Sequence, residues 1–291
     1  MKIELSSTEK SQLGNRKILK NGSLSTFSYP SANMWPKLRE YLVQKSFKTN
    51  SLLDTNLTAY TPGETWKLLQ HPIIRKWHQE MSRFKVPAGT KAIVFVPCAK
   101  TKPWKGPAIS KSKLYTAYNQ LLKEEKDLYF VTISEPLGVV PHEYWDSFPQ
   151  YDNPGLFRDD ALRSGMMTEE WSFSPFKQKY IIPFDEKLRQ KSIEYLGAII
   201  GAFLTTNQNV RMLSFVDNVN GDLSTHTQML KRAKEITGLE IDTYFKKTIS
   251  RKSPYEYMKA IFNSSRLGKD TPGFIYGEEL PTSRIHSIII L

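Results

Sequence analysis

The amino-acid sequence predicts an α/β fold: a mostly parallel sheet with flanking helices, preceded by a basic and mainly helical N-terminal region. Two observations support this prediction. In the middle of the chain, continuous apolar runs typical of strands buried on both faces alternate with amphipathic helical patterns. Towards the N-terminus, apolar residues recur at helical spacing among many lysines and arginines. We expect three regions: a basic N-terminal region at 1–88, an α/β core at 89–250 and a basic C-terminal extension at 251–291.

Two helices are predicted in the N-terminal region. The first spans residues 35–43, where four apolar or aromatic side chains share one helical face. The second runs from about residue 65 to residue 84, with "TPGE" as its start signal and "VPAG" as its stop signal. The proline and glycine at 87–89 mark the boundary with the core.

The predicted core alternates strands and helices. Its strands are expected at 92–98, 128–134, 210–216 and 240–245, and its helices at about 114–122, 188–204 and 223–237. This alternation implies a mostly parallel sheet with helical crossovers. Ligands of such sheets bind beyond the carboxyl ends of the strands. We therefore expect the segments 98–104, 134–143 and 217–220 to share one edge of the sheet.

The composition is that of a globular protein from a reducing compartment. Of the 291 residues, 40% are hydrophobic and 12% aromatic, and the single cysteine excludes an internal disulfide. No apolar run approaches the length of a membrane helix, and the N-terminus lacks the apolar stretch of a signal peptide. We expect a cytoplasmic protein with no membrane partner. One cysteine and five scattered histidines do not supply a cysteine-rich zinc site, so we expect neither metal nor cofactor.

The net charge of +12 is concentrated in the two flanks of the chain. Residues 1–91 hold 15 Lys and Arg against 6 Asp and Glu, residues 92–245 hold 18 against 19, and residues 246–291 hold 8 against 4. The N-terminal flank also interleaves aromatic side chains with its lysines, a combination suited to stacking on bases and contacting phosphates. This distribution favours a nucleic-acid partner, although flanks that only keep the protein soluble would have the same charge.

The single thiol, Cys98, ends the first predicted strand of the core and is followed by three lysines within residues 100–105. Ammonium groups near a thiol favour the reactive thiolate, whereas a cysteine without a chemical role is usually a small buried hydrophobe. These facts leave both interpretations open. The chain has no phosphate-binding loop and no convincing Cys-His-Asn set for proteolysis. His142 and His226 are candidate bases, although a lone histidine is more often structural.

Three motifs around the thiol resemble the core of archaeosine synthase. "PCAKTKPW" (97–104), followed by "SKS" (110–112), resembles the PC-x3-KPY motif of that family with its trailing serines. "ISEPLGVVPHE" (133–143) is similar to the family's PLG-VP-E stretch, and "FPQYDNPG" (148–155) is similar to its YP…YD-P element. The resemblance covers about residues 92–245. We recognise no tRNA-guanine-transglycosylase-like portion, which the family carries, in this sequence.

The resemblance implies an enzyme that modifies the nitrile of 7-cyano-7-deazaguanine. Archaeosine synthase is implied to join an amine donor, lysine, to that nitrile in tRNA. This chain departs from the family pattern in three ways: Lys113 follows the serines in place of a histidine, Trp104 replaces a tyrosine, and "KGPAI" is inserted before the serines. The departures lie in the serine-lysine loop, so the resemblance implies the nitrile site and leaves the amine donor open.

A nitrile resists water but accepts a thiolate, which gives a thioimide; an amine then yields an amidine, and water yields an amide. Cys98 is the expected nucleophile, and Lys102 is expected to favour the thiolate or orient the substrate. Glu135 is the third expected catalytic residue, because a carboxylate accepts two N–H bonds from the amino and amide edge of a deazaguanine. The residues expected to bind substrate are Pro97, Pro103, Trp104, Ser110, Ser112, Ser134, Gly138, His142, Asp152 and Asp217. The two serines of "SKS" would serve equally well as caps of the following helix.

Three functions are open at this level. The first is an enzyme that converts the nitrile of a 7-deazaguanine in DNA or tRNA to an amidine or amide, with or without a small amine as co-substrate. In a duplex, such an enzyme would have to flip the base out of the stack. The second is a nucleic-acid-binding module on a similar scaffold, without catalysis. The third is an enzyme of the same fold that acts on a free 7-deazaguanine precursor.

Overall fold

The computed structural model describes twelve stretches of the chain: residues 27–28, 35–49, 53–99, 104, 113–146, 150–156, 179–180, 184–216, 224–244, 255–256, 258–259 and 261–262. The chain forms two compact units, and each is described here by itself. The first unit comprises residues 1–78 and 149–196, and the second comprises residues 79–148 and 197–291. Their limits differ from those of the three predicted regions.

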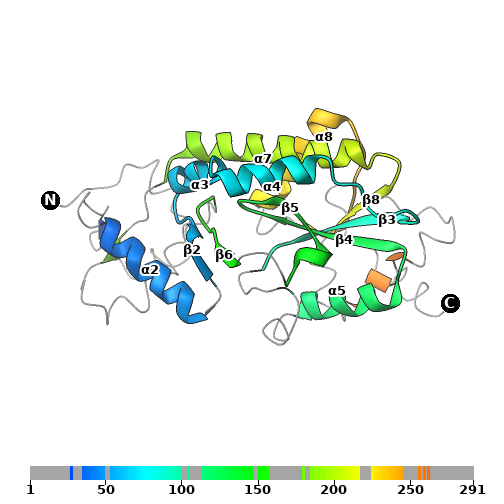
Figure 1. Cartoon of the computed structure of the whole chain (residues 1–291), viewed down its shortest axis with the longest axis horizontal. Helices are drawn as coiled ribbons and strands as arrows, with labels where there is room; N and C mark the ends of the chain where they lie inside the picture. Colours follow the sequence, from blue (N-terminus) through cyan, green and yellow to red (C-terminus); the bar gives the residue numbers. More distant parts are fainter. Residues whose placement is uncertain are drawn as a thin grey trace. The chain divides into compact units, whose positions relative to one another are not determined.

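The first unit contains short parallel strand pairs and helices (Figure 1). Its elements are β1 (Phe27–Ser28), α2 (Trp35–Thr49), β2 (Leu53–Thr58), α3 (Pro62–Leu69), the start of α4 (Pro72–Ser82), β6 (Gln150–Asp152), β7 (Lys179–Tyr180) and the start of α7 (Glu186–Thr206). β1 pairs with β7 and β2 pairs with β6, both in parallel. The predicted helix at 35–43 is present and extends further, to Thr49.

The prediction of one unbroken helix at 65–84 is wrong, because the structure has two helices there, α3 and α4. Pro72 has no backbone N–H to donate to the preceding turn of a helix, and its ring disfavours helical backbone at His71, the residue before it. The start signal itself acts as predicted, although α3 begins earlier, at Pro62. Thr61 caps α3, since its Oγ1 accepts a hydrogen bond from the Glu64 N–H at 3.1 Å.

The second unit is built on a five-stranded sheet in the order β5-β4-β3-β8-β9. These strands are β3 (Ala92–Pro97), β4 (Leu128–Ser134), β5 (Gly138–Pro141), β8 (Arg211–Ser214) and β9 (Asp242–Thr243). β3, β4, β8 and β9 run parallel, and β5 returns antiparallel to β4. The fold is therefore α/β with a mostly parallel sheet, as predicted. The four predicted strands of the core are present, and β5 was not predicted.

Helices cover both faces of this sheet, which explains why β3 and β4 are buried on both sides. On one face, Phe203 of α7 packs edge-to-face on Phe95 of β3, and α8 (Thr225–Thr237) lies beside the second half of α7. On the other face, Tyr118 of α5 (Lys113–Glu124) packs on Phe130 of β4. In Figure 1, α5 lies below the strands, and α7 and α8 lie above them.

The described part of the predicted C-terminal extension belongs to the second unit. Met258, Ile261 and Phe262 are buried. The ring of Phe262 packs edge-to-face on Phe130 of β4 and on Phe215, just beyond β8. This segment therefore helps to close the face of the sheet that α5 covers. Among the described helices, none combines the length and the apolar character that a membrane crossing requires.

The order of the strands creates a switch point at the carboxyl edge of the sheet. From β3 the chain passes through α5 to β4 on one side, whereas from β8 it passes through α8 to β9 on the other side. β3 and β8 are neighbours, so the segments that leave their carboxyl ends diverge. In open α/β sheets the crevice at such a point is where ligands bind.

Candidate active site

Three titratable side chains meet at this edge, each placed by a different element. Cys98 directly follows β3, and its N–H donates to the carbonyl oxygen of Ile133 in β4 at 3.1 Å, which fixes the residue next to the sheet. Glu135 directly follows β4. His226 is the second residue of α8, whose N-terminus is capped by Ser224. The expected convergence of segments after the first and second strands is thus observed for Cys98 and Glu135.

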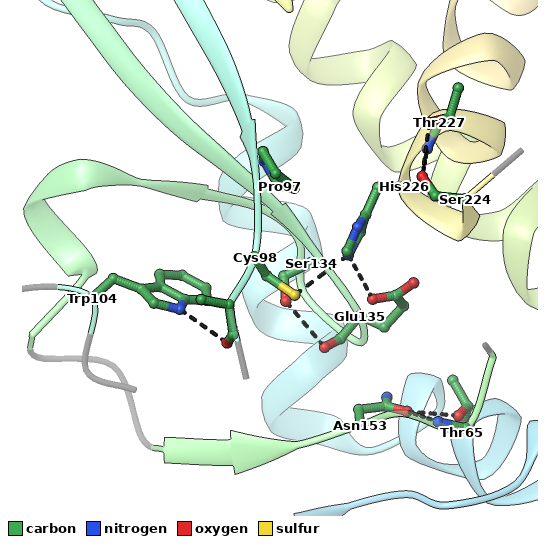
Figure 2. A network of polar contacts seen from close by, with 12 residues as sticks. Thr65, Pro97, Cys98, Trp104, Ser134, Glu135, Asn153, Ser224, His226 and Thr227 are labelled. Atoms are coloured by element: carbon green, nitrogen blue, oxygen red, sulfur yellow. Dashed lines mark hydrogen bonds and ion pairs between the residues drawn. The ribbon is translucent and has the colours of Figure 1, made fainter. Parts of the chain in front are cut away.

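The side chains of Cys98, His226 and Glu135 point toward one another (Figure 2). The Cys98 Sγ lies 3.4 Å from Nε2 of His226, and the same Nε2 lies 3.0 Å from Oε2 of Glu135. The thiol is half-buried, whereas His226 is 5% and Glu135 2% exposed. A buried carboxylate and imidazole in contact are stable only as a paired, hydrogen-bonded group.

The electrostatics of the cluster favour a protonated imidazole. Burial lowers the pKa of His226, but the Glu135 carboxylate and, less strongly, Cys98 raise it by more, so that it lies well above its usual value. A positive charge 3.4 Å from the sulfur favours the thiolate. The N-terminus of α8, which carries His226, adds a partial positive charge at the same place.

The arrangement differs from the relay of serine and cysteine proteases. In that relay the acid holds one ring nitrogen of the histidine and the nucleophile faces the other. Here Cys98 and Glu135 both face Nε2 of His226, so one N–H serves two acceptors. The second carboxylate oxygen of Glu135, Oε1, is buried and has no hydrogen-bond partner among the described residues. It is therefore an acceptor available to a ligand N–H or to a cation.

Comparisons with known proteins give one domain match and no function. Residues 74–155 match DUF5591, a domain of unknown function. No curated protein and no solved structure matches the chain. The DUF5591 match contains Cys98 and Glu135 with the strands that carry them, β3 and β4. It does not contain His226, which reaches the site from α8.

Two predicted substrate-binding residues, Pro97 and Trp104, make contacts within the protein next to the site. The Pro97 carbonyl accepts a hydrogen bond from the Tyr115 hydroxyl at 3.0 Å. The Trp104 indole is 3% exposed and stacks on the Tyr115 ring, and its Nε1–H donates to the Ala99 carbonyl at 3.3 Å. Trp104 therefore links Ala99, next to Cys98, to Tyr115 of α5, and Figure 2 shows its bond to the backbone beside Cys98.

Ser134 and Gly138, also predicted to bind substrate, lie at the connection between β4 and β5. Ser134 is fully buried and its hydroxyl lies 3.4 Å from the Glu135 carbonyl oxygen. Gly138 pairs with Ser134 across the hairpin and has a φ of 74°, a conformation that other residues rarely adopt. Both residues shape the turn that places the Glu135 carboxylate beside His226.

The expected position of His142 is wrong. Because β5 runs antiparallel to β4, it carries the chain back from the carboxyl edge, and Pro141 pairs with Val131. The His142 ring consequently packs on Tyr129, near the beginning of β4, with ring centroids 4.8 Å apart. The prediction placed all of residues 134–143 at the carboxyl edge, because the antiparallel strand β5 was not predicted.

The remaining predicted residues do not join the cluster in the described structure. Asp152 belongs to the first unit, where it accepts hydrogen bonds from the hydroxyls of Ser46 and Tyr60. Five further predicted site residues lie outside the described residues: Lys102, Pro103, Ser110, Ser112 and Asp217.

His226 is the functional residue that the sequence analysis undervalued. It was considered only as one of two candidate bases, with a structural role preferred. A stronger indication was present in the sequence: "LSTHTQ" places this histidine in the first turn of a helix that follows the third strand of the core. The first turn of such a helix lies at the carboxyl edge of the sheet, where ligands bind.

Proposed function

We propose that this protein is a nucleic-acid base-modification enzyme that converts the nitrile of 7-cyano-7-deazaguanine to an amide or an amidine through a cysteine thioimide. The observation that carries the proposal is the 3.4 Å separation between Cys98 Sγ and Nε2 of the buried His226. This contact supplies a nucleophile and a proton donor at one point. The likeness of the Cys98 and Glu135 motifs to archaeosine synthase supports the choice of substrate.

In the first step the Cys98 thiolate attacks the nitrile carbon. An S–C bond forms, one π bond of the nitrile breaks, and the nitrogen takes the Nε2 proton of His226. The product is a neutral thioimide, Cys–S–C(=NH)–R, beside a neutral imidazole. Glu135, 3.0 Å from the same nitrogen, stabilises the imidazolium before the transfer and holds the ring in place.

In the second step water or an amine adds to the thioimide carbon, and the imine nitrogen becomes NH2. The tetrahedral intermediate then loses a proton to His226 as its C–S bond breaks. With water the product is the amide, C(=O)–NH2; with an amine R′NH2 it is the amidine, C(=NH)–NHR′. Both routes return the thiolate and the imidazolium, and neither needs an oxidant or a reductant.

The basic flanks support nucleic acid, rather than the free base, as the carrier of the nitrile. Residues 1–91 carry 15 Lys and Arg against 6 Asp and Glu, and residues 246–291 carry 8 against 4, whereas residues 92–245 are nearly neutral. Basic flanks of this kind bind phosphates with little sequence preference. The nearly neutral middle, which holds Cys98, Glu135 and His226, would then receive the base itself.

Intact-mass spectrometry with 7-cyano-7-deazaguanine, free and within an oligonucleotide, tests the proposal. We expect an adduct of the mass of the substrate that is absent from Cys98→Ala. Its rate of formation should fall about 100-fold or more in His226→Gln, because a positioned acid contributes at least that much. His142→Gln, a histidine variant at the other end of β4, is the matched control and should react normally. No adduct with either form, and no base conversion with ammonium, lysine or glutamine added, would refute the proposal.

A further inference from the structure

In the Cys98, His226 and Glu135 cluster, a single ring nitrogen faces both the sulfur and a carboxylate oxygen. The Cys98 Sγ, one ring nitrogen of His226 and one carboxylate oxygen of Glu135 all lie within 4.8 Å of one another. Nε2 carries at most one hydrogen, yet it faces the sulfur at 3.4 Å and the carboxylate oxygen at 3.0 Å. The other oxygen of Glu135 is buried without a partner among the described residues. A single cation with several coordination positions would bind the sulfur, the ring nitrogen and a carboxylate oxygen at once.

Two of the three separations between ligand atoms in the cluster are close to those around a zinc ion, and the third, between the sulfur and a carboxylate oxygen, lies within 4.8 Å. Zinc binds sulfur at about 2.3 Å, imidazole nitrogen at about 2.0–2.1 Å and carboxylate oxygen at about 2.0–2.2 Å, in tetrahedral geometry. Those bond lengths place nitrogen and oxygen about 3.4 Å apart and sulfur and nitrogen about 3.6 Å apart. The observed separations, 3.0 Å and 3.4 Å, require shifts of only a few tenths of an ångström. A thiolate ligand selects zinc over magnesium or calcium.

We propose that Cys98, His226 and Glu135 bind one zinc ion reversibly, and that the bound ion blocks the thiol. Three protein ligands leave the fourth coordination position of zinc open to water. A thiolate bound to the ion has one lone pair engaged and part of its charge neutralised, so it attacks an electrophile more slowly. This inference departs from the sequence analysis, which expected no metal site because it looked for several cysteines rather than one cysteine with a histidine and a carboxylate.

Metal binding is tested directly with the full chain freed of metal by EDTA. Cobalt(II) is the probe, because a cobalt–thiolate bond gives a charge-transfer band in the near ultraviolet. We expect one cobalt per chain with this band, its displacement by zinc, and no effect of magnesium. Cys98→Ser should lose the band, and His226→Gln should bind at least tenfold more weakly, whereas His142→Gln should match the wild type. Circular dichroism checks that each variant is folded, and wild-type protein alkylated at Cys98 replaces Cys98→Ser if that variant does not fold.

Two results would overturn the metal site. One is the absence of the charge-transfer band. The other is a band of unchanged affinity in folded His226→Gln, which would mean that the thiol binds cobalt without the cluster.

The blocking of the thiol is tested separately, and its effect on catalysis rests on the proposed function. Zinc should slow alkylation of Cys98 by iodoacetamide at least tenfold, and EDTA should restore the rate. Zinc binding without this protection would overturn the blocking. Protection from iodoacetamide in a protein that forms no thioimide without zinc would support the metal inference and refute the proposed nitrile chemistry, so the two failures are distinguishable.

Discussion

Replacing both charged partners of Cys98 should shift its reactivity by an amount that the distances set. At an effective dielectric constant of about 20, the His226 imidazolium at 3.4 Å attracts the thiolate by about 5 kcal/mol. The Glu135 carboxylate, no more than 4.8 Å from the sulfur, repels it by about 3.5 kcal/mol or more. The net stabilisation of the thiolate is at most about 1.4 kcal/mol, a factor of about ten in its population. We expect the double variant His226→Gln/Glu135→Gln to lose this factor.

The assay is the rate of alkylation of Cys98 by iodoacetamide as a function of pH, in EDTA, followed by intact mass. The midpoint of the pH profile should move up by no more than about one pH unit in the double variant. The rate at pH 7 should fall at most about threefold, because a more basic thiolate is also more nucleophilic. His142→Gln should leave the profile unchanged. A midpoint that rises by about two pH units or more in the double variant would refute the electrostatic reasoning.

Two further predictions concern stability. In EDTA, the raised pKa of His226 means that the folded state holds a proton that the unfolded state has lost, so stability is fully present below about pH 6.5 and falls as pH rises towards the folded-state pKa. Urea unfolding of the wild type should show a slope of up to about 1.4 kcal/mol per pH unit, and His226→Gln should lose it; equal slopes would contradict the assignment. On α7, Gly197→Ala should destabilise the protein by about 1–3 kcal/mol, because its Cβ would lie 2.6 Å from Cγ of Arg232. Gly201→Ala, with no atom nearer than 3.4 Å, should be neutral or stabilising by up to about 1 kcal/mol in thermal unfolding, and equal losses in both variants would refute this.

The strands and helices of the core could be predicted because their patterns are local. β4, at Leu128–Ser134, is a continuous apolar run and was predicted with its observed limits. α8 ends at Thr237, the predicted residue, and Gly238, which has a φ of 68°, caps it. β5 has no comparable local pattern. Its four residues, Gly138–Pro141, form a strand because the edge of β4 is there to pair with.

The candidate site was predictable only in part, since burial and distance between segments are not encoded in a short motif. Cys98 and Glu135 each follow a recognisable strand, so the common edge that they share follows from a parallel sheet. His226 lies 128 positions after Cys98, and the order of the strands alone decides that the two meet. The sequence analysis established that β8 exists but not that it lies beside β3.

That strand order also explains how the three residues of the proposed nitrile chemistry come together. Had β8 joined the sheet beyond β4, α8 would begin two strands away from Cys98, and no acid would face the sulfur. Because β8 lies next to β3, the first turn of α8 begins beside the thiol and brings a buried imidazole with it. Glu135 directly follows β4, which lies on the other side of β3 from β8, and its carboxylate keeps that imidazole protonated. The proposed nucleophile, proton donor and counter-charge thus come from the carboxyl ends of β3 and β4 and the first turn of α8.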